Sequence, residues 1–422
     1  MCGFNAINQV IAFSSALLFA SVAVALDAQA QESNVLDAAT EIHDRILVLD
    51  THVDFPFEYA TPVADPNQDA ELQVDLPKMM DGQVDAIFFV VFVPQTERTE
   101  ENYATAKAQA QSKFNAIRRM AMDEYSDQIE LALTAADVRR LHAEGKKAAL
   151  IGVENGYPLK NDVGLLREYF ALGARYMSLT HNGHNDLADS SSIRTELGDV
   201  NVEHGGLSPL GLSVVAEMNK VGIMVDVAHA AKSTVLEIAR VSQAPIISSH
   251  HALKHFVNIP RNLDDEELLA IKATGGVVQI VAFDTYVKAV DPEKLEARKN
   301  LAEQFGIDSF EEFRAMSGKQ RSVYMVERSK LDEHWPRASV ADFVDHIDYA
   351  VTLVGIDHVG LSSDFGGGGG IDGWDDASET LNVTVELVQR GYSEQQIGQL
   401  WGGNLLRVME DVERIARTLR SD

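Results

Sequence analysis

Short apolar runs alternate with helical patterns along most of the chain. Eight of these runs are rich in β-branched and aromatic residues and have the length of buried strands. They span residues 46–49, 84–93, 148–153, 174–179, 222–227, 246–249, 276–283 and 358–362. Segments with apolar residues at helical spacing lie beside or between them, at 34–45, 100–122, 134–144, 208–220, 233–240, 264–274, 342–354 and 404–419. This alternation is typical of parallel sheets, and eight units predict an α/β fold, a (β/α)8 TIM barrel in a single domain.

The longest interruption of the pattern lies at about 285–338, between the seventh and eighth predicted strands. It is charged and helix-prone, and we interpret it as an insertion that serves as a lid, an interface element or decoration. With 45% hydrophobic and 24% charged residues, the chain has the balance of a globular protein with a large core. No repeat or low-complexity linker divides it, so residues 31–422 are expected to form one domain.

The first 30 residues have the pattern of a secretory signal peptide. An apolar stretch at 10–26 precedes Ala28-Gln29-Ala30, which fits a small-x-small cleavage site. No lysine or arginine precedes this stretch, and its length approaches that of a membrane span, so an uncleaved N-terminal anchor is the alternative. Cleavage predicts a periplasmic or secreted protein without stable membrane insertion.

Cysteine content and charge limit the available chemistry. The only cysteine, Cys2, lies in the predicted signal, so the processed chain has neither a disulfide nor a thiolate ligand. Any bound metal must therefore be held by His, Asp or Glu. The net charge of −28 argues against nucleic acid or an anionic membrane as a partner.

Histidines and carboxylates follow six of the eight predicted strands. They are His52, Asp54, Glu154, His181, His229, His250 and Asp364. In a (β/α)8 barrel the C-terminal ends of the strands converge on one face, where active sites lie. Packing alone does not explain this repeated placement, so we expect the seven side chains to share one site.

Five of these residues predict a centre for two divalent metal ions such as Zn²⁺: His52, Asp54, Glu154, His229 and His250. Glu154 has two carboxylate oxygens and is expected to bridge ions about 3.5–4 Å apart, which would share a nucleophilic hydroxide. Asp364 is then expected to pass the proton of the bridging water to a leaving amine. His181 is expected to stabilise the oxyanion of a tetrahedral intermediate.

Each of these residues also has a purely structural interpretation. His181 lies in a polar loop and fits a surface histidine, and His251 beside His250 leaves the choice of ligand ambiguous by one position. Asp364 precedes the glycine run 366–370 and fits the start of a turn. Because the run lacks the strand-then-helix pattern of a phosphate loop, we interpret it as a flexible loop.

Together the strand-end motifs identify a family resemblance. The motifs are Asp50-Thr51-His52-Val53-Asp54, Gly152-Val153-Glu154, Leu179-Thr180-His181-Asn182, Asp226-Val227-Ala228-His229, Ser249-His250, Arg261-Asn262 and Ser363-Asp364-Phe365. In this order, over nearly the whole chain, they resemble the membrane (renal) dipeptidase family, which has many bacterial members. The resemblance implies the metal-dependent hydrolase form of the barrel, with two zinc ions per chain. One zinc would be bound by His52 and Asp54 and the other by His229 and His250, with Glu154 as the bridge.

The resemblance also implies how a substrate is handled. His181 would bind the substrate carbonyl and its tetrahedral intermediate, and Asp364 would carry the proton. Arg261 would pair with the free carboxylate of a dipeptide, because a guanidinium fork fits a carboxylate with two hydrogen bonds. The implied activity is a zinc-dependent dipeptidase that hydrolyses the peptide bond of small dipeptides and accepts a C-terminal D-residue.

Some features depart from the family pattern. Family members often have a second acid soon after the aspartate of the Ser-Asp-Phe motif, where this chain has Gly366. The residues after His181 differ from those of animal members, and the insertion at 285–338 has no assigned role. Without cysteine the processed chain cannot form the disulfide-linked dimers of animal members, which leaves a non-covalent homodimer open.

Two other functions are compatible with the same residues. The first is a related barrel metallohydrolase acting on a lactone, an N-acyl amino acid or a cyclic amide. Many of those enzymes use His-x-His after the first strand and a carbamylated lysine after the fourth, whereas this chain has His-x-Asp and Glu154. The second is a non-catalytic binding protein on the same fold, and the complete set of candidate ligands argues against it. A purely structural zinc site is disfavoured because such sites usually rely on cysteine.

Overall fold

The computed structural model describes residues 33–68, 72–307, 312, 316 and 318–421. The predicted signal peptide, residues 1–30, lies outside the described residues together with Cys2, so export of the protein stays a prediction. In the described part of the chain, no helix combines the length and the apolar character needed to cross a membrane.

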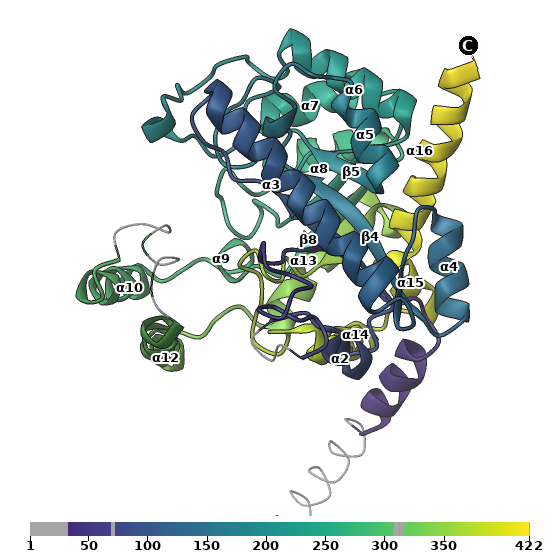
Figure 1. The fold of residues 1–422 in the computed structure, drawn as a ribbon. Helices are drawn as coiled ribbons and strands as arrows, with labels where there is room; N and C mark the ends of the chain where they lie inside the picture. Colours follow the sequence, from purple (N-terminus) through teal and green to yellow (C-terminus); the bar gives the residue numbers. More distant parts are fainter. Residues whose placement is uncertain (1–32, 69–71, 308–311, 313–315, 317, 422) are drawn as a thin grey trace, which may run out of the picture.

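Eight parallel strands form the barrel that the sequence predicts. Their spatial order follows the chain. They are β1 (Leu49–Val53), β2 (Ala86–Phe92), β4 (Lys147–Glu154), β5 (Ala174–Ser178), β6 (Met224–Asp226), β7 (Ile247–His251), β8 (Val277–Val281) and β9 (Val359–Ser362). Val53 forms a parallel bridge with Phe365, just beyond β9, which brings the last strand back to the first. Helices pack around these strands (Figure 1), and the (β/α)8 prediction is confirmed.

One further strand, β3 (Ile129–Leu131), was not predicted. It pairs in parallel with the first residues of β4, Lys147 to Ala149. A strand of three residues is too short to show alternation or a distinct apolar run, so the sequence offers no usable signal for it.

The predicted helices are present within a few residues of their expected ends. Besides a helix over 33–43, they are α3 (Glu100–Arg118), α4 (Ala135–Ala143), α6 (Pro209–Val221), α7 (Lys232–Val241), α8 (Asp265–Ala273), α13 (Val340–Val354) and α16 (Asn404–Ser421). Thr134 and Asp137 form the predicted capping box at the start of α4. Helices α2 (Leu76–Asp81), α5 (Leu165–Leu172), α14 (Leu381–Gln389) and α15 (Glu394–Gly398) were not predicted.

The N-terminal end of the barrel is closed by an apolar plug. The first residues of several strands, among them Leu49, Ala86 and Val277, are fully buried in one cluster with Leu405 and Met409 of α16. Burial of side chains this large stabilises the fold by about 1.5–3 kcal/mol each. With one end filled in this way, the polar residues collect at the other end, where the strands finish.

The segment at 285–338 is largely helical. It contains α10 (Pro292–Gln304) and α12 (Gly318–His334), and the short helix α9 (Asp284–Val287) leads into it from β8. In Figure 1, α10 and α12 stand to one side of the barrel as an arm, connected to it by two chain segments.

Candidate active site

The seven strand-end residues predicted from the sequence meet at the C-terminal face of the barrel. His52 and His250 lie on β1 and β7, and Glu154 is the last residue of β4. Asp54, His181, His229 and Asp364 follow the ends of β1, β5, β6 and β9 by one to three residues. Their potential ligand atoms fall into three overlapping groups, each within 4.8 Å: His52 with His250 and Asp364, Glu154 with His181 and His229, and His52 with Asp54 and Glu154.

Glu154 lies between two sets of imidazoles. Its Oε1 is 3.1 Å from His229 Nε2 and 3.4 Å from His250 Nε2. Its Oε2 is 3.8 Å from His52 Nε2. One carboxylate oxygen therefore faces each side of the site, which is the arrangement that a bridging ligand requires.

His52 faces two further carboxylates. Its Nε2 lies 3.5 Å from Asp54 Oδ2 and 3.9 Å from Asp364 Oδ1. Burial disfavours a charge on His52, but the neighbouring carboxylates outweigh it and raise its pKa to about 9. Burial and the nearby acids also raise the pKa of Asp364 to about 8, although the charge of His52 opposes this. Three carboxyl groups thus surround one imidazole, and both raised pKa values reflect a site where acids crowd together and a bound cation would relieve their repulsion.

The Nδ1 atom of His52 is hydrogen-bonded to the hydroxyl of Tyr176. The Tyr176 hydroxyl donates to the backbone oxygen of Thr51 (3.1 Å) and so accepts a hydrogen bond from His52 Nδ1 (2.9 Å). This fixes a proton on Nδ1 and turns Nε2 toward the carboxylates, so that a cation bound there would take the place of the Nε2 proton. In metal sites, hydrogen bonds of this kind to the other ring nitrogen orient histidine ligands.

His250 and His229 are oriented in the same way. The Ser249 hydroxyl donates to Asp226 (2.6 Å) and accepts from His250 Nδ1 (2.8 Å), and the Asn182 side-chain oxygen accepts from His229 Nδ1 (3.2 Å). Burial holds the pKa of both imidazoles well below the usual value, so both are neutral. Their Nε2 lone pairs then face each other at 3.1 Å, where a cation between them would satisfy both.

Two buried polar atoms at the centre have no hydrogen-bond partner among the described residues. They are His52 Nε2 and Asp54 Oδ1. A buried polar group without a partner costs about 1–3 kcal/mol, so two such atoms side by side indicate a position where a ligand binds. The donors are nitrogen and carboxylate oxygen, a set that divalent zinc and similar metals accept. The residues therefore fit a metal centre.

The backbone is strained where the site is built. His229, Asp364 and Asn155, which follows Glu154, have φ of 63°, 57° and 77°. Such left-handed conformations are rare for non-glycine residues and cluster at functional sites. At each position the strain turns the chain sharply at a strand end.

The glycine run 366–370 forms a hydrogen-bonded turn, and its flexibility stays a prediction. Gly369 N donates to Asp364 O (2.8 Å) and Gly370 N to Ala282 O (2.8 Å). A Cβ on Gly367 would lie 2.3 Å from Asp364 Oδ1 and 2.7 Å from Asp54 Oδ2. The backbone of Gly367 thus closes one side of the site, and it lies so close to the two carboxylates that a Cβ at this position would clash with them.

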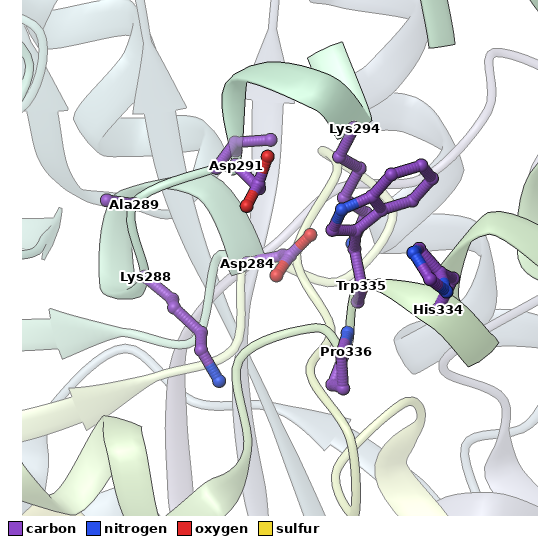
Figure 2. Close-up of a pocket in the computed structure, with 9 residues that line it drawn as sticks. Asp284, Lys288, Ala289, Asp291, Lys294, His334, Trp335 and Pro336 are labelled. Carbon is purple, nitrogen blue, oxygen red and sulfur yellow. The ribbon is translucent and has the colours of Figure 1, made fainter. Parts of the chain in front are cut away.

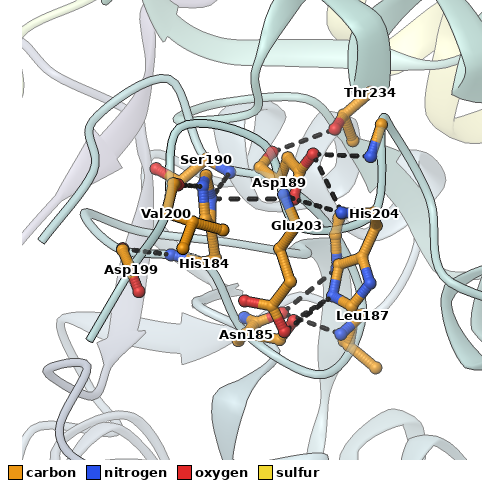
Figure 3. A network of polar contacts seen from close by, with 12 residues as sticks. His184, Asn185, Leu187, Asp189, Ser190, Asp199, Val200, Glu203, His204 and Thr234 are labelled. Atoms are coloured by element: carbon orange, nitrogen blue, oxygen red, sulfur yellow. Dashed lines mark hydrogen bonds and ion pairs between the residues drawn. The ribbon is translucent and has the colours of Figure 1, made fainter. Parts of the chain in front are cut away.

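The loop between β5 and α6 carries His181 and is stabilised by internal hydrogen bonds (Figure 3). Asp189 accepts hydrogen bonds from the N–H groups of His204 and Gly205. His184 accepts from Ser190 N (2.9 Å) and bonds Val200 O (2.8 Å), so its role is internal to the loop. The ring of His181 is partly exposed and packs 4.2 Å from that of His229 and 4.6 Å from that of Phe92.

Arg261 is buried at the edge of the site, with only 4% of its surface exposed. Its Nη2 donates to the backbone oxygen of His250 (3.1 Å), while Nε and Nη1 have no hydrogen-bond partner in the described chain. The guanidinium also lies 5.5 Å from the centre of the Tyr286 ring. A buried guanidinium with free donors is prepared for a carboxylate.

The structure distinguishes His250 from its neighbour and adds residues that the sequence did not indicate. His251 hydrogen-bonds Ser248 (2.5 Å) and belongs to none of the described ligand groups. Tyr176 orients His52 but carries no sequence signal beyond its place on a strand, and Ser249, although part of the Ser249-His250 motif, had no role assigned from the sequence. Lys113 of α3 is buried 3.9 Å from Asp54 Oδ1, a contact between segments far apart in the chain that only the tertiary structure reveals.

Comparison with known proteins shows which family the chain belongs to. A family profile described as membrane dipeptidase (peptidase family M19) matches residues 36–422. Dipeptidase verJ of Clonostachys rogersoniana is 30% identical over 398 residues, 91% of this chain and 89% of that protein. The crystal structure of the probable dipeptidase PvdM from Pseudomonas aeruginosa is 34% identical with a TM-score of 0.81, covering 91% of this chain and 99% of PvdM. A metallopeptidase from Rhodobacter sphaeroides, solved with a phosphinate mimic of the dipeptide L-Ala-D-Ala, has the same fold at 22% identity and a TM-score of 0.67, covering 87% of this chain and 99% of that one. With the fold, the clustered ligands and the profile in agreement, the chain belongs to the membrane dipeptidase family, peptidase family M19.

Proposed function

We propose that this protein is a dipeptidase that works with two divalent metal ions, zinc being the ion that best suits its donors. His52 and Asp54 would hold one ion and His229 and His250 the other, with Glu154 between them. The observation that carries this proposal is the position of Glu154, whose two oxygens face different histidines at 3.1 and 3.8 Å. Two bound ions would supply a water nucleophile at neutral pH and polarise the substrate carbonyl.

The remaining residues have the positions needed to move a proton and to bind the reacting oxygen. Asp364 Oδ1 lies inside the ligand cluster, and bound cations would favour its carboxylate form, which would take a proton from water there and hand it to a leaving amine. His181 is close to Glu154 and His229 but is partly exposed, which leaves its ring accessible to a substrate oxygen. Donors aimed at such an oxygen stabilise the charge that develops during acyl transfer.

Arg261 sets the length of the substrate. Its free donors lie beside His250, so a bound carboxylate must be close to the scissile bond. A dipeptide places its C-terminal carboxylate one residue beyond that bond. The Rhodobacter sphaeroides enzyme was solved with a mimic of L-Ala-D-Ala, which supports including substrates with a C-terminal D-residue.

The proposal is tested by metal content and turnover together. Wild type, Glu154→Gln and Asp357→Asn are compared for bound metal and for hydrolysis of L-L and L-D dipeptides, with C-terminally amidated versions as controls. Asp357 is a matched acid outside the site, where it accepts a hydrogen bond from Gln399. We expect about two ions per chain and cleavage of free dipeptides only, both lost in Glu154→Gln and kept in Asp357→Asn.

Other outcomes would redirect or refute the assignment. Bound metal without dipeptide cleavage would favour the related hydrolase acting on a lactone, an N-acyl amino acid or a cyclic amide. Full activity after removal of metal by a chelator would refute the metal-centre proposal. We also propose that residues 1–30 direct export, which N-terminal sequencing of the protein from a periplasmic or culture fraction tests.

A further inference from the structure

A lysine is buried beside the candidate metal ligands. Lys113 of α3 has only 3% of its surface exposed. It lies on the buried face of the helix between Ala110 and Ile117, at the spacing typical of apolar core positions. Lysine is almost never buried to this degree unless its charge is compensated, so the neighbours of this ammonium group indicate its role.

The ammonium group of Lys113 is held at one point. Its Nζ donates a hydrogen bond to the backbone oxygen of Phe55 (2.8 Å), the residue that follows Asp54. It also lies 4.5, 5.2 and 5.9 Å from the ring centres of Phe55, Phe57 and Phe92. At such distances the face of an aromatic ring attracts a cation. The carbonyl and the rings therefore fix a positive charge next to Asp54.

The carboxylate of Asp54 lies between this charge and the ligand cluster. Its Oδ1 is 3.9 Å from Lys113 Nζ, and its Oδ2 is 3.5 Å from His52 Nε2. Hydrogen bonds between nitrogen and oxygen are about 2.7–3.2 Å long, so Lys113 acts on Asp54 through charge rather than through a hydrogen bond. Opposite charges this close together attract each other strongly in a buried site.

This contact differs in its effect from the hydrogen bond between Tyr176 and His52. A hydrogen bond fixes the direction of a ligand and thereby favours metal binding. The charge of Lys113 stabilises the Asp54 carboxylate when no metal is bound, but repels a cation that binds there. A buried charge without a partner strongly destabilises a fold. The ammonium group thus favours folding of the site before metal is bound.

We propose that Lys113 is the counter-charge of Asp54 in the metal-free protein. It stabilises the assembled site until metal binds, and it lowers the affinity for the ion that Asp54 holds. The inference rests on the proposed metal centre, to which it adds a residue that is not itself a ligand. Its consequence is that the chain folds first and takes up metal afterwards.

Zinc affinity and urea unfolding test this proposal on wild type, Lys113→Met and Lys113→Arg. Lys113→Met removes the charge and keeps an unbranched apolar side chain. We expect its metal-free form to unfold at a lower urea concentration, and its zinc affinity, measured against a chromogenic chelator, to rise at least about tenfold. Tighter binding adds stability, so saturating zinc should narrow the difference in urea midpoint from wild type. Lys113→Arg keeps the charge and should keep the zinc affinity of wild type.

Lys294 of α10 is a matched buried lysine outside the ligand cluster. It is also 3% exposed, pairs with Asp332 (2.8 Å) and donates a hydrogen bond to Trp335 O (2.6 Å). Both Lys294 and Trp335 line the cavity shown in Figure 2. Lys294→Met should destabilise the metal-free and the zinc-bound protein equally, and it should leave zinc affinity unchanged.

The alternatives give different results. Equal zinc affinity of wild type and Lys113→Met would overturn the proposal and leave Lys113 a purely structural role. Weaker binding by Lys113→Met would also overturn it, because Lys113 would then orient Asp54 as a hydrogen-bonding partner does. A wild type that binds no zinc would refute the proposed metal centre itself and, with it, this role. Lys113→Gln, which keeps a donor for Phe55 O, replaces Lys113→Met should the latter fail to fold.

Discussion

The hydroxyl of Tyr176 gives the sharpest test of how the site is held. It is fully buried and connects two groups, accepting from His52 Nδ1 and donating to Thr51 O. Tyr176→Phe removes only this oxygen and keeps the ring. It leaves a buried N–H and a buried C=O without a partner, and each such group costs about 1–3 kcal/mol. Relaxation toward water reduces that total, so we expect the metal-free protein to lose about 2–3 kcal/mol of unfolding free energy.

The same substitution should weaken metal binding. Without its partner, His52 is free to rotate or to move its proton to Nε2, which removes the lone pair from the metal side. Loss of a hydrogen-bond partner that orients a metal-binding histidine typically lowers metal affinity by about 10–100-fold. Zinc competition against a chromogenic chelator measures the affinity, and urea unfolding of the metal-free protein measures the stability.

Tyr169→Phe is the matched control. Tyr169 lies in α5, is also buried, and has a hydroxyl without a hydrogen-bond partner among the described residues. Its removal should leave both stability and metal affinity unchanged or slightly higher. If Tyr176→Phe and Tyr169→Phe gave equal zinc affinity and equal unfolding free energy, the argument that Tyr176 orients His52 would be refuted.

Two further substitutions probe the glycine turn and a distant ion pair. Gly367→Ala should reduce both metal affinity and kcat at least about tenfold, since its Cβ would meet Asp364 and Asp54 at 2.3 and 2.7 Å; zinc competition and steady-state kinetics check this, and wild-type values would contradict it. His142 Nδ1 lies 3.1 Å from Asp85 Oδ2, and the neighbouring carboxylate raises the histidine pKa in the folded state. Protonation therefore favours folding, so His142→Gln should lose at most about 1 kcal/mol at pH 5 and nothing at pH 9. Equal losses at both pH values, measured by urea unfolding, would show that the pair does not act through charge.

The sequence determined the barrel and the identity of the clustered side chains. Short apolar runs at regular intervals require buried strands, and helices between them require parallel pairing. Parallel pairing then places every strand's C-terminal end on one face. Consequently the residues that follow the apolar runs, such as His52, Glu154 and His229, had to approach one another, although they lie far apart in the sequence.

Only the tertiary structure decided how those side chains are used. The periodicity of a strand shows which face a residue occupies, but not which atom on another strand it meets. Tyr176 of β5 reaches His52 of β1, and Asp226 of β6 orients His250 through Ser249, contacts that arise when the sheet closes. The close approach of Gly367 to two carboxylates likewise depends on distances between segments far apart in the chain. The position of α10 and α12 was also undetermined by their sequence, because a charged, helix-prone segment without a clear apolar face does not show which part of the molecule it packs against.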